Sequence, residues 1–230
     1  MERDLSVLTR RTFGKDAHVV HDSQFQLLML ATAMTVLGTS LLSPILETLT
    51  VSFSVSQAEI GLLISAFAIP PVVLIPVGGA IADRYGRRPV LILGLLVFGT
   101  AGSAIALTTN FTLVLGLRAL QGIGYAFTIP VAITCVRDLY SGGEEATGQG
   151  IRLAVGGFSQ VVFPIVGSLL LVVAWQFPFL LYGLTVPVAI AFYLRFEEPA
   201  SILDEETDTA SPVSEEEQPT PSRGAYLKEL

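Results

Sequence analysis

Long stretches without a charged residue constrain the fold of this chain more than any other feature of its sequence. No charge lies between Asp22 and Glu47 or between Glu59 and Asp83, which leaves uncharged runs of 24 and 23 residues. A helix needs about 20 apolar residues to cross the hydrocarbon core of a bilayer. Each run therefore predicts one membrane-spanning helix. Only 14% of the 230 residues are charged and 51% are hydrophobic, which excludes a soluble domain of ordinary composition.

Two further regions are long enough for two helices each. Residues 89–136 contain a single charge, Arg118, and are interrupted at 108–110; residues 153–194 contain none and are interrupted near Trp175. We therefore predict an all-α membrane protein with six transmembrane helices. The predicted helices cover residues 25–46, 60–82, 89–108, 111–136, 150–173 and 176–195.

The basic residues predict how the chain is oriented in the membrane. When successive loops are assigned to alternate sides, twelve of the thirteen lysines and arginines fall on one side, and the loops of the opposite side carry none. Lysine and arginine concentrate in cytoplasmic loops. Both termini are thus predicted to be cytoplasmic, and the plasma membrane is the expected location of the chain.

The charge balance divides the chain into three parts. Ten of the twenty acidic residues lie in 197–230, whereas the rest of the chain has ten acidic and eleven basic residues. The C-terminal part is also rich in proline, serine and threonine, a composition that cannot bury a core. We predict a cytoplasmic N-terminal segment (1–24), a transmembrane bundle (25–195) and an acidic, disordered cytoplasmic tail (196–230).

Polar side chains at helical spacing indicate a solute cavity inside the bundle. The first helix carries four hydroxyls on one face, which serve either the cavity or helix packing. An arginine within a span costs at least ~2.5 kcal/mol near the bilayer centre. Arg118 is therefore expected to face a cavity or the bundle interior, and its alternative is to extend toward the membrane surface. The predicted cavity residues are Thr32, Thr35, Thr39, Ser43, Arg118, Gln121, Tyr125 and Gln160.

A charged, glycine-rich motif lies between the second and third predicted helices. Residues 78–89 read GGAIADRYGRRP and contain one aspartate, three arginines and three glycines. This segment resembles the signature motif of the major facilitator superfamily of transporters, and its location in a short cytoplasmic loop agrees with that family. The alternative is a basic cytoplasmic loop with a solvated aspartate.

Other segments extend the resemblance over residues 25–195. Residues 118–124, RALQGIG, are similar to the family's second motif, and Leu37-Gly38 followed by Pro44 resembles a weaker third. Residues 159–168 match the antiporter motif only in part, since phenylalanine and serine occupy two of its glycine positions. The residues expected to serve helix packing or hinge motion are Pro44, Gly122, Gly124, Pro164 and Gly167.

The resemblance implies that the motif acts as a cytoplasmic gate. In the family, the motif's aspartate, here Asp83, holds the N-terminus of a helix in the other half of the transporter. The later arginine pairs with an acid that ends the fourth helix, which implies an Arg87–Asp138 pair. The predicted gating residues are Gly79, Asp83, Arg84, Gly86, Arg87, Arg88 and Asp138.

Members of this family usually have twelve helices in two halves, and this chain resembles the N-terminal half with the central linker. The resemblance implies that the six helices form two three-helix repeats. We expect a secondary transporter that works by alternating access with a C-terminal half or a second copy. The only charge in the predicted cavity is positive, so an anionic or neutral solute is favoured. The alternative is a truncated relic or a non-transporting membrane scaffold whose acidic tail binds a partner.

An enzyme is not expected, because the sequence has no Ser/His/Asp arrangement and no phosphate-binding glycine loop. The single cysteine, Cys135, lies inside a predicted span and is expected to be a small packing residue. The two histidines lack metal-ligand partners nearby, so no metal is predicted. No cofactor and no nucleic-acid partner is predicted either.

Overall fold

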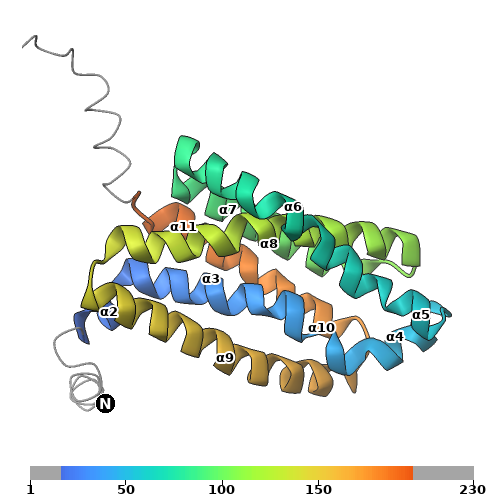
Figure 1. Ribbon diagram of the computed structural model, residues 1–230. Helices are drawn as coiled ribbons and strands as arrows, with labels where there is room; N and C mark the ends of the chain where they lie inside the picture. The colour runs from blue at the N-terminus through green and yellow to red at the C-terminus, as the bar shows by residue number, and fades with distance from the viewer. Residues whose placement is uncertain (1–16, 199–230) are drawn as a thin grey trace, which may run out of the picture.

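The computed structural model describes residues 17–198, and every regular element in that range is a helix (Figure 1). The first elements are α2 (Ala17–His21), α3 (Ser23–Ser40), η2 (Ser43–Ile45), α4 (Leu46–Phe53), α5 (Gln57–Ile60) and α6 (Leu62–Tyr85). They are followed by α7 (Arg87–Ala104), η3 (Ile105–Leu107), α8 (Phe111–Leu139), α9 (Gly143–Leu171), α10 (Phe177–Leu180), η4 (Leu181–Leu184) and α11 (Thr185–Arg195). Six segments of this range are long and apolar enough to cross a membrane. The all-α, six-helix membrane fold predicted from the charge spacing is therefore confirmed.

The first membrane span breaks after α3. Pro44 has no backbone N–H, so it cannot donate to the Ser40 carbonyl, and the α-helical hydrogen-bond pattern is interrupted at this position. The chain makes one 3₁₀ turn at η2 and then resumes as α4, and the whole span covers 31 residues. The predicted end of this helix at residue 46 is wrong, because Glu47 ends the uncharged run but not the helix.

Three other helices extend past their predicted ends on the side that carries the basic residues. Helix α6 continues to Tyr85, α8 continues to Leu139, and α9 begins at Gly143 instead of residue 150. Arginine and glutamate are good helix formers. A charged residue therefore marks where the chain leaves the apolar region, and the helix continues beyond it.

Helix α8 occupies the centre of the packing. It lies along α6 and α7 and also contacts α3, whose other side packs on α9 (Figure 1). A Cβ atom at Gly124 would lie 2.5 Å from the Phe98 backbone nitrogen of α7, and one at Gly122 would overlap the Phe67 carbonyl oxygen of α6. Such close backbone approach stabilises helix association in lipid through van der Waals contact.

Helices α9 and α6 are the least covered elements of the described bundle. Only 11% of the most apolar stretch of α9 and 22% of that of α6 are buried. Helix α9 contacts the break in the first span through Gly167, where a Cβ atom would lie 2.6 Å from Leu41 Cδ1. Pro164 lies inside α9, one turn before this contact.

The buried apolar side chains form two clusters, one at each end of the bundle. The cluster near the glycine-rich motif includes Phe25, Leu91 and Phe192. The cluster at the opposite end includes Phe98 and Phe179. These two clusters fix the relative positions of the helices. The candidate functional residues lie within the second cluster, beside Leu63, Phe67 and Tyr182, and at the motif end.

Candidate functional site

Arg118 lies in the interior of the bundle, with 1% of its surface exposed. Its guanidinium donates to the Gln121 side-chain oxygen (2.6 Å), the Gly38 carbonyl (3.2 Å), the Leu63 carbonyl (3.4 Å) and the Tyr182 hydroxyl (3.4 Å). The guanidinium carbon also lies 4.9 Å from the centre of the Phe67 ring, which is a cation–π distance. None of the ion pairs within residues 17–198 involves Arg118. Arg118 thus lies in the bundle interior and does not extend toward the membrane surface.

The acceptors of Arg118 lie beside the break in the first span. Arg118 donates to the carbonyl of Gly38, and the Tyr182 hydroxyl donates to the carbonyl of Leu37 at 3.0 Å. Both carbonyls belong to the last turn of α3, and the Leu37 carbonyl also accepts from the Leu41 backbone N–H at 3.2 Å. Together, Arg118 and Tyr182 connect α8 and η4 to the end of α3, and the bond to Leu63 adds α6.

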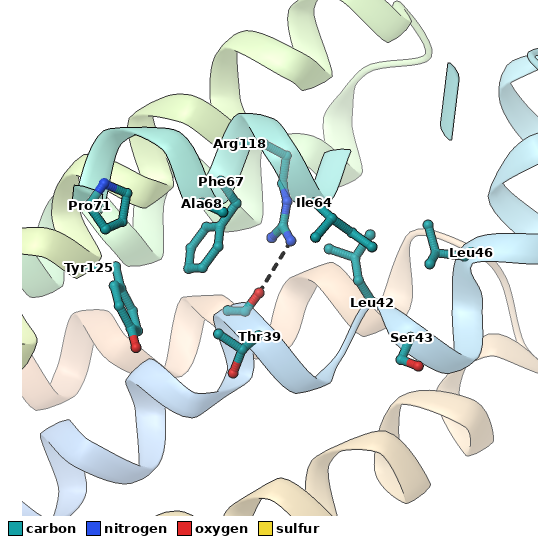
Figure 2. Close-up of a pocket in the computed structure, with 11 residues that line it drawn as sticks. Thr39, Leu42, Ser43, Leu46, Ile64, Phe67, Ala68, Pro71, Arg118 and Tyr125 are labelled. Carbon is teal, nitrogen blue, oxygen red and sulfur yellow. Dashed lines mark hydrogen bonds between the residues drawn. The ribbon is translucent and has the colours of Figure 1, made fainter. Parts of the chain in front are cut away.

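A cavity of about 340 Å³ lies between the first span, α6 and α8. Arg118 lies in its wall, and the guanidinium points across it toward the first span (Figure 2). Phe67 and Ala68 come from α6, and Thr39 and Ser43 face them from the first span. The cavity therefore combines mostly apolar walls with one cation and a few hydroxyls, which is the usual make-up of a small-molecule site.

Four of the predicted cavity residues line this space: Thr39, Ser43, Arg118 and Tyr125. The other four lie elsewhere. Thr32, Thr35 and Gln121 are buried in the core outside the cavity wall. Gln160 is exposed on α9. Thr32, Thr35 and Thr39 lie on α3, whereas Ser43 lies in η2 after the break. The Thr35 hydroxyl bonds the carbonyls of its own helix at 2.9 and 3.0 Å.

Two buried polar atoms near the site have no hydrogen-bond partner among the described residues. They are the Thr32 hydroxyl oxygen and the Gln121 amide nitrogen. The Gln121 nitrogen lies close to Gly102 of α7, where a Cβ atom would overlap it. A buried polar atom without a partner costs stability. The Gln121 side chain is held instead by its carbonyl oxygen, which accepts from Arg118.

Tyr182 was not among the residues predicted from the sequence. It is completely buried, donates to Leu37 and accepts from Arg118. Its ring packs against Phe98 with centroids 5.6 Å apart. The glycine at position 102 could have indicated it, because that glycine leaves the space that the Tyr182 ring occupies.

A second polar cluster lies where α6 meets α7, at the glycine-rich motif. Arg87 donates from Nε to the Asp138 carboxylate at 3.0 Å and also pairs with Asp83 one turn earlier. The Arg87 side chain is 9% exposed and that of Asp138 is 13% exposed. The arginine therefore joins the end of α6, the start of α7 and the end of α8.

Glu198 completes this cluster from a distant part of the sequence. Its carboxylate accepts from the backbone N–H groups of Arg87 and Arg88, the latter at 3.0 Å. It thereby satisfies N–H groups that begin α7 and have no intrahelical partner. Gly86 permits this contact, since its φ of 94° lies in the region that favours glycine and a Cβ atom there would lie 3.0 Å from the carboxylate.

The position of Glu198 corrects the predicted start of the acidic tail at residue 196. Phe196 is 1% exposed and packs with Phe192, so the ordered bundle continues past residue 195. The composition of the segment predicted disorder, but a single phenylalanine and a single carboxylate are enough to fix its first residues. The rest of the predicted tail and the predicted segment up to residue 16 lie outside the described residues.

The face of α6 that carries Gly79 and Asp83 is open within residues 17–198. No heavy atom lies within 4 Å of a Cβ atom placed on Gly79, and the Asp83 side chain is 67% exposed. Arg84 is also exposed, and its guanidinium lies 5.5 Å from the Tyr85 ring centre. This surface therefore has room for a further helix.

The start of α3 and the end of α8 are joined at the same end of the bundle. The Tyr140 hydroxyl donates to the Asp22 carboxylate at 2.5 Å, and the Tyr140 ring packs edge-on against Phe25. Burial, together with the neighbouring Asp22 carboxylate, raises the pKa of Tyr140. Its hydroxyl therefore stays protonated and remains a donor at physiological pH.

Replacement of Arg87 tests the energetic weight of the motif cluster. We expect Arg87→Gln to lower the free energy of unfolding by about 1–3 kcal/mol, because it leaves the mostly buried Asp138 carboxylate without its charged donor. Arg84→Gln removes an exposed arginine from the same motif and should change stability by less than about 0.5 kcal/mol. Thermal unfolding of the detergent-purified variants, followed by size-exclusion chromatography, measures both. Equal stability of the two variants would contradict a structural role for the Arg87 cluster.

The fold and these two clusters define a class of membrane transport proteins. Residues 28–228 match the family model of the Major Facilitator Superfamily, and the chain belongs to that family. It is 31% identical to the bacillibactin exporter of Bacillus subtilis over 150 residues, which cover 62% of this chain and 37% of that protein. It is 24% identical to the quinolone resistance protein NorA of Staphylococcus aureus over 147 residues, which cover 64% of this chain and 38% of NorA.

Solved structures show the same fold at lower sequence identity. The inward-open structure of the xylose transporter XylE from E. coli superposes with a TM-score of 0.69 at 16% identity, over 80% of this chain and 49% of XylE. The chain thus spans less than half the length of the relatives and structure to which it is similar.

Proposed function

We propose that this chain forms one half of a secondary transporter that moves a small solute across the plasma membrane by alternating access. One observation carries the proposal: Arg118, a cation in the bundle interior that forms no ion pair with residues 17–198, lies in the wall of a cavity of about 340 Å³. An ionisable residue inside a membrane bundle is costly and marks a solute or ion pathway. Transporters of this kind bind their solutes within the bundle, at the interface between repeats.

The chemistry of the cavity favours an anionic or neutral solute. Among the described residues, Arg118 is the only charged one in the cavity wall, and its partners there are neutral groups. A carboxylate or hydroxyl of the solute would hydrogen-bond to this guanidinium, and an aromatic part would contact Phe67 or Tyr125. The similarity to a bacillibactin exporter and to a quinolone resistance protein supports efflux as the direction.

A second six-helix unit completes the proposed transporter. The apolar surfaces of α6 and α9 are largely uncovered, and the Gly79 face of α6 has room for a helix. Asp83 lies on that face and would accept hydrogen bonds from the N-terminus of a helix of the second unit, closing the cytoplasmic side. The second unit is either a C-terminal half or another copy of this chain. In this proposal both termini of the chain lie on the cytoplasmic side.

Efflux from membrane vesicles tests this function. The chain is co-expressed with the C-terminal half of a family relative, or linked in tandem to a second copy, and a panel of anionic and neutral fluorescent solutes is followed. We expect flux of at least one anionic or neutral solute, and its loss when Asp83 is replaced by asparagine in a variant that still assembles. Absence of flux in every assembled pair would instead support a non-transporting scaffold.

A further inference from the structure

A second groove lies on the outer surface of the bundle, between the start of α7 and the end of α11. Its volume is about 540 Å³, and its walls are formed by Arg88, Pro89, Ile92, Leu93, Leu96 and Tyr193. Leu93 is 61% exposed and Tyr193 is 64% exposed, so the groove opens to the surroundings of the bundle. It shares no residue with the Arg118 cavity. The proposed transport path therefore does not explain it.

Arg88 places a fixed positive charge at one end of this groove. Its Nη2 donates to the Tyr193 backbone carbonyl, and its guanidinium carbon lies 5.7 Å from the centre of the Tyr193 ring. The nearby Glu198 carboxylate is bound to the backbone N–H groups of Arg87 and Arg88, and the ion pairs within residues 17–198 do not include Arg88. A guanidinium has five N–H groups, so most of them remain available to an anionic ligand.

The groove runs from the membrane surface into the apolar region. Arg88 lies at the second residue of α7, and Leu96 lies eight residues further on, about 12 Å deeper along the helix axis. Arginine and tyrosine are favoured at the headgroup level, whereas isoleucine and leucine are favoured among acyl chains. The groove thus presents a cation at headgroup depth above an apolar wall at acyl-chain depth.

We propose that this groove binds an anionic phospholipid. The lipid phosphate accepts hydrogen bonds from the Arg88 guanidinium, which suits a phosphate because it can donate two parallel bonds. One acyl chain lies along Ile92, Leu93 and Leu96. A lipid with a net negative charge is preferred over a zwitterionic one by about fivefold when one basic residue holds its phosphate, because no ammonium group offsets the phosphate. Such a lipid would connect α7 to α11 next to the motif cluster of Arg87.

Native mass spectrometry of the purified full chain tests the proposal. The probes are phosphatidylglycerol and phosphatidylcholine with identical acyl chains, added in equal amounts. We expect about fivefold more phosphatidylglycerol than phosphatidylcholine to remain bound. Arg88→Gln should reduce this ratio to near one, whereas Arg88→Lys should keep most of it. Arg84→Gln, which removes an exposed arginine outside the groove, should leave the ratio unchanged.

Two further arms distinguish a lipid in the groove from lipid held elsewhere on the bundle and from free phosphate. Leu93→Trp fills the apolar part and should lower the retention of both lipids severalfold, while Leu169→Trp on the exposed face of α9 should not. Millimolar glycerol 3-phosphate should fail to displace phosphatidylglycerol, and displacement would show a site for free phosphate instead. An equal ratio of the two bound lipids in the Arg88→Gln and Arg84→Gln variants would overturn the proposal. Equal lipid retention by all variants, as expected if polypeptide covers the groove, would also overturn it. Thermal unfolding confirms that each variant is folded.

Discussion

Arg118→Ala is expected to reduce solute flux by about 10- to 100-fold, which corresponds to the loss of one hydrogen bond to a charged group at the solute. The same change should lower the free energy of unfolding by about 2 kcal/mol, since three interhelical hydrogen bonds are lost and each contributes roughly 0.6 kcal/mol in a membrane protein. Those bonds join α8 to the Gly38 carbonyl, the Leu63 carbonyl and the Tyr182 hydroxyl. Vesicle efflux and thermal unfolding measure the two effects.

Two variants separate the charge of Arg118 from its geometry. Arg118→Lys keeps the positive charge but loses the planar group that reaches several acceptors at once. It should therefore be destabilised almost as much as Arg118→Ala while retaining more flux of an anionic solute. Arg137→Ala removes an exposed arginine from the same helix and should leave both quantities unchanged. Flux in Arg118→Ala equal to that of the unmodified protein, for every transported solute, would remove Arg118 from the site.

Gly122→Val is expected to cause the largest loss of stability, about 3 kcal/mol or more. The new Cβ atom would overlap the Phe67 carbonyl oxygen of α6. That atom belongs to the backbone and cannot rotate away as a flexible side chain does, so α8 and α6 must separate. Because Phe67 also lines the solute cavity and lies over the Arg118 guanidinium, separation of the helices should reduce flux as well.

Gly116→Val on the same helix is the matched control. A Cβ atom at Gly116 meets no heavy atom of the described residues within 4 Å, and valine has a slightly higher helix propensity than glycine. Its unfolding temperature should stay within a degree or two of the unmodified protein or rise. If both glycine variants lose stability equally, the close approach of α8 to α6 is not the cause.

The number and placement of the membrane spans could be predicted from the sequence, because the cost of a charge in hydrocarbon acts on each residue without reference to its neighbours. The interior position of Arg118 could be predicted from the same cost. Helix ends were less predictable. Glu47 was expected to end a helix that continues for six more residues. Outside the hydrocarbon core a helix does not need apolar side chains, so a charged residue there does not end it.

The partners of Arg118 could not be predicted, because two of them are backbone carbonyls, which every residue carries. Which carbonyl is free depends on the break at Pro44 and on the approach of α8 to α3. The hydroxyl face of α3 shows a similar limit. Spacing places Thr35 and Thr39 on the same side of the helix, but only the packing of the other helices determines that Thr39 reaches the cavity.

Contacts from Arg118 to backbone carbonyls also have a consequence for sequence variation. Substituting Leu63 changes a side chain but leaves in place the carbonyl that accepts from Arg118. At Gly38 the carbonyl is likewise kept, but added bulk is restricted, because a Cβ atom would lie 2.6 Å from the Phe67 ring. The connection between these helices thus depends on the arginine and on local space. The hydrogen bond to Leu63 is independent of the side chain at that position, which is constrained instead by its packing in the buried core.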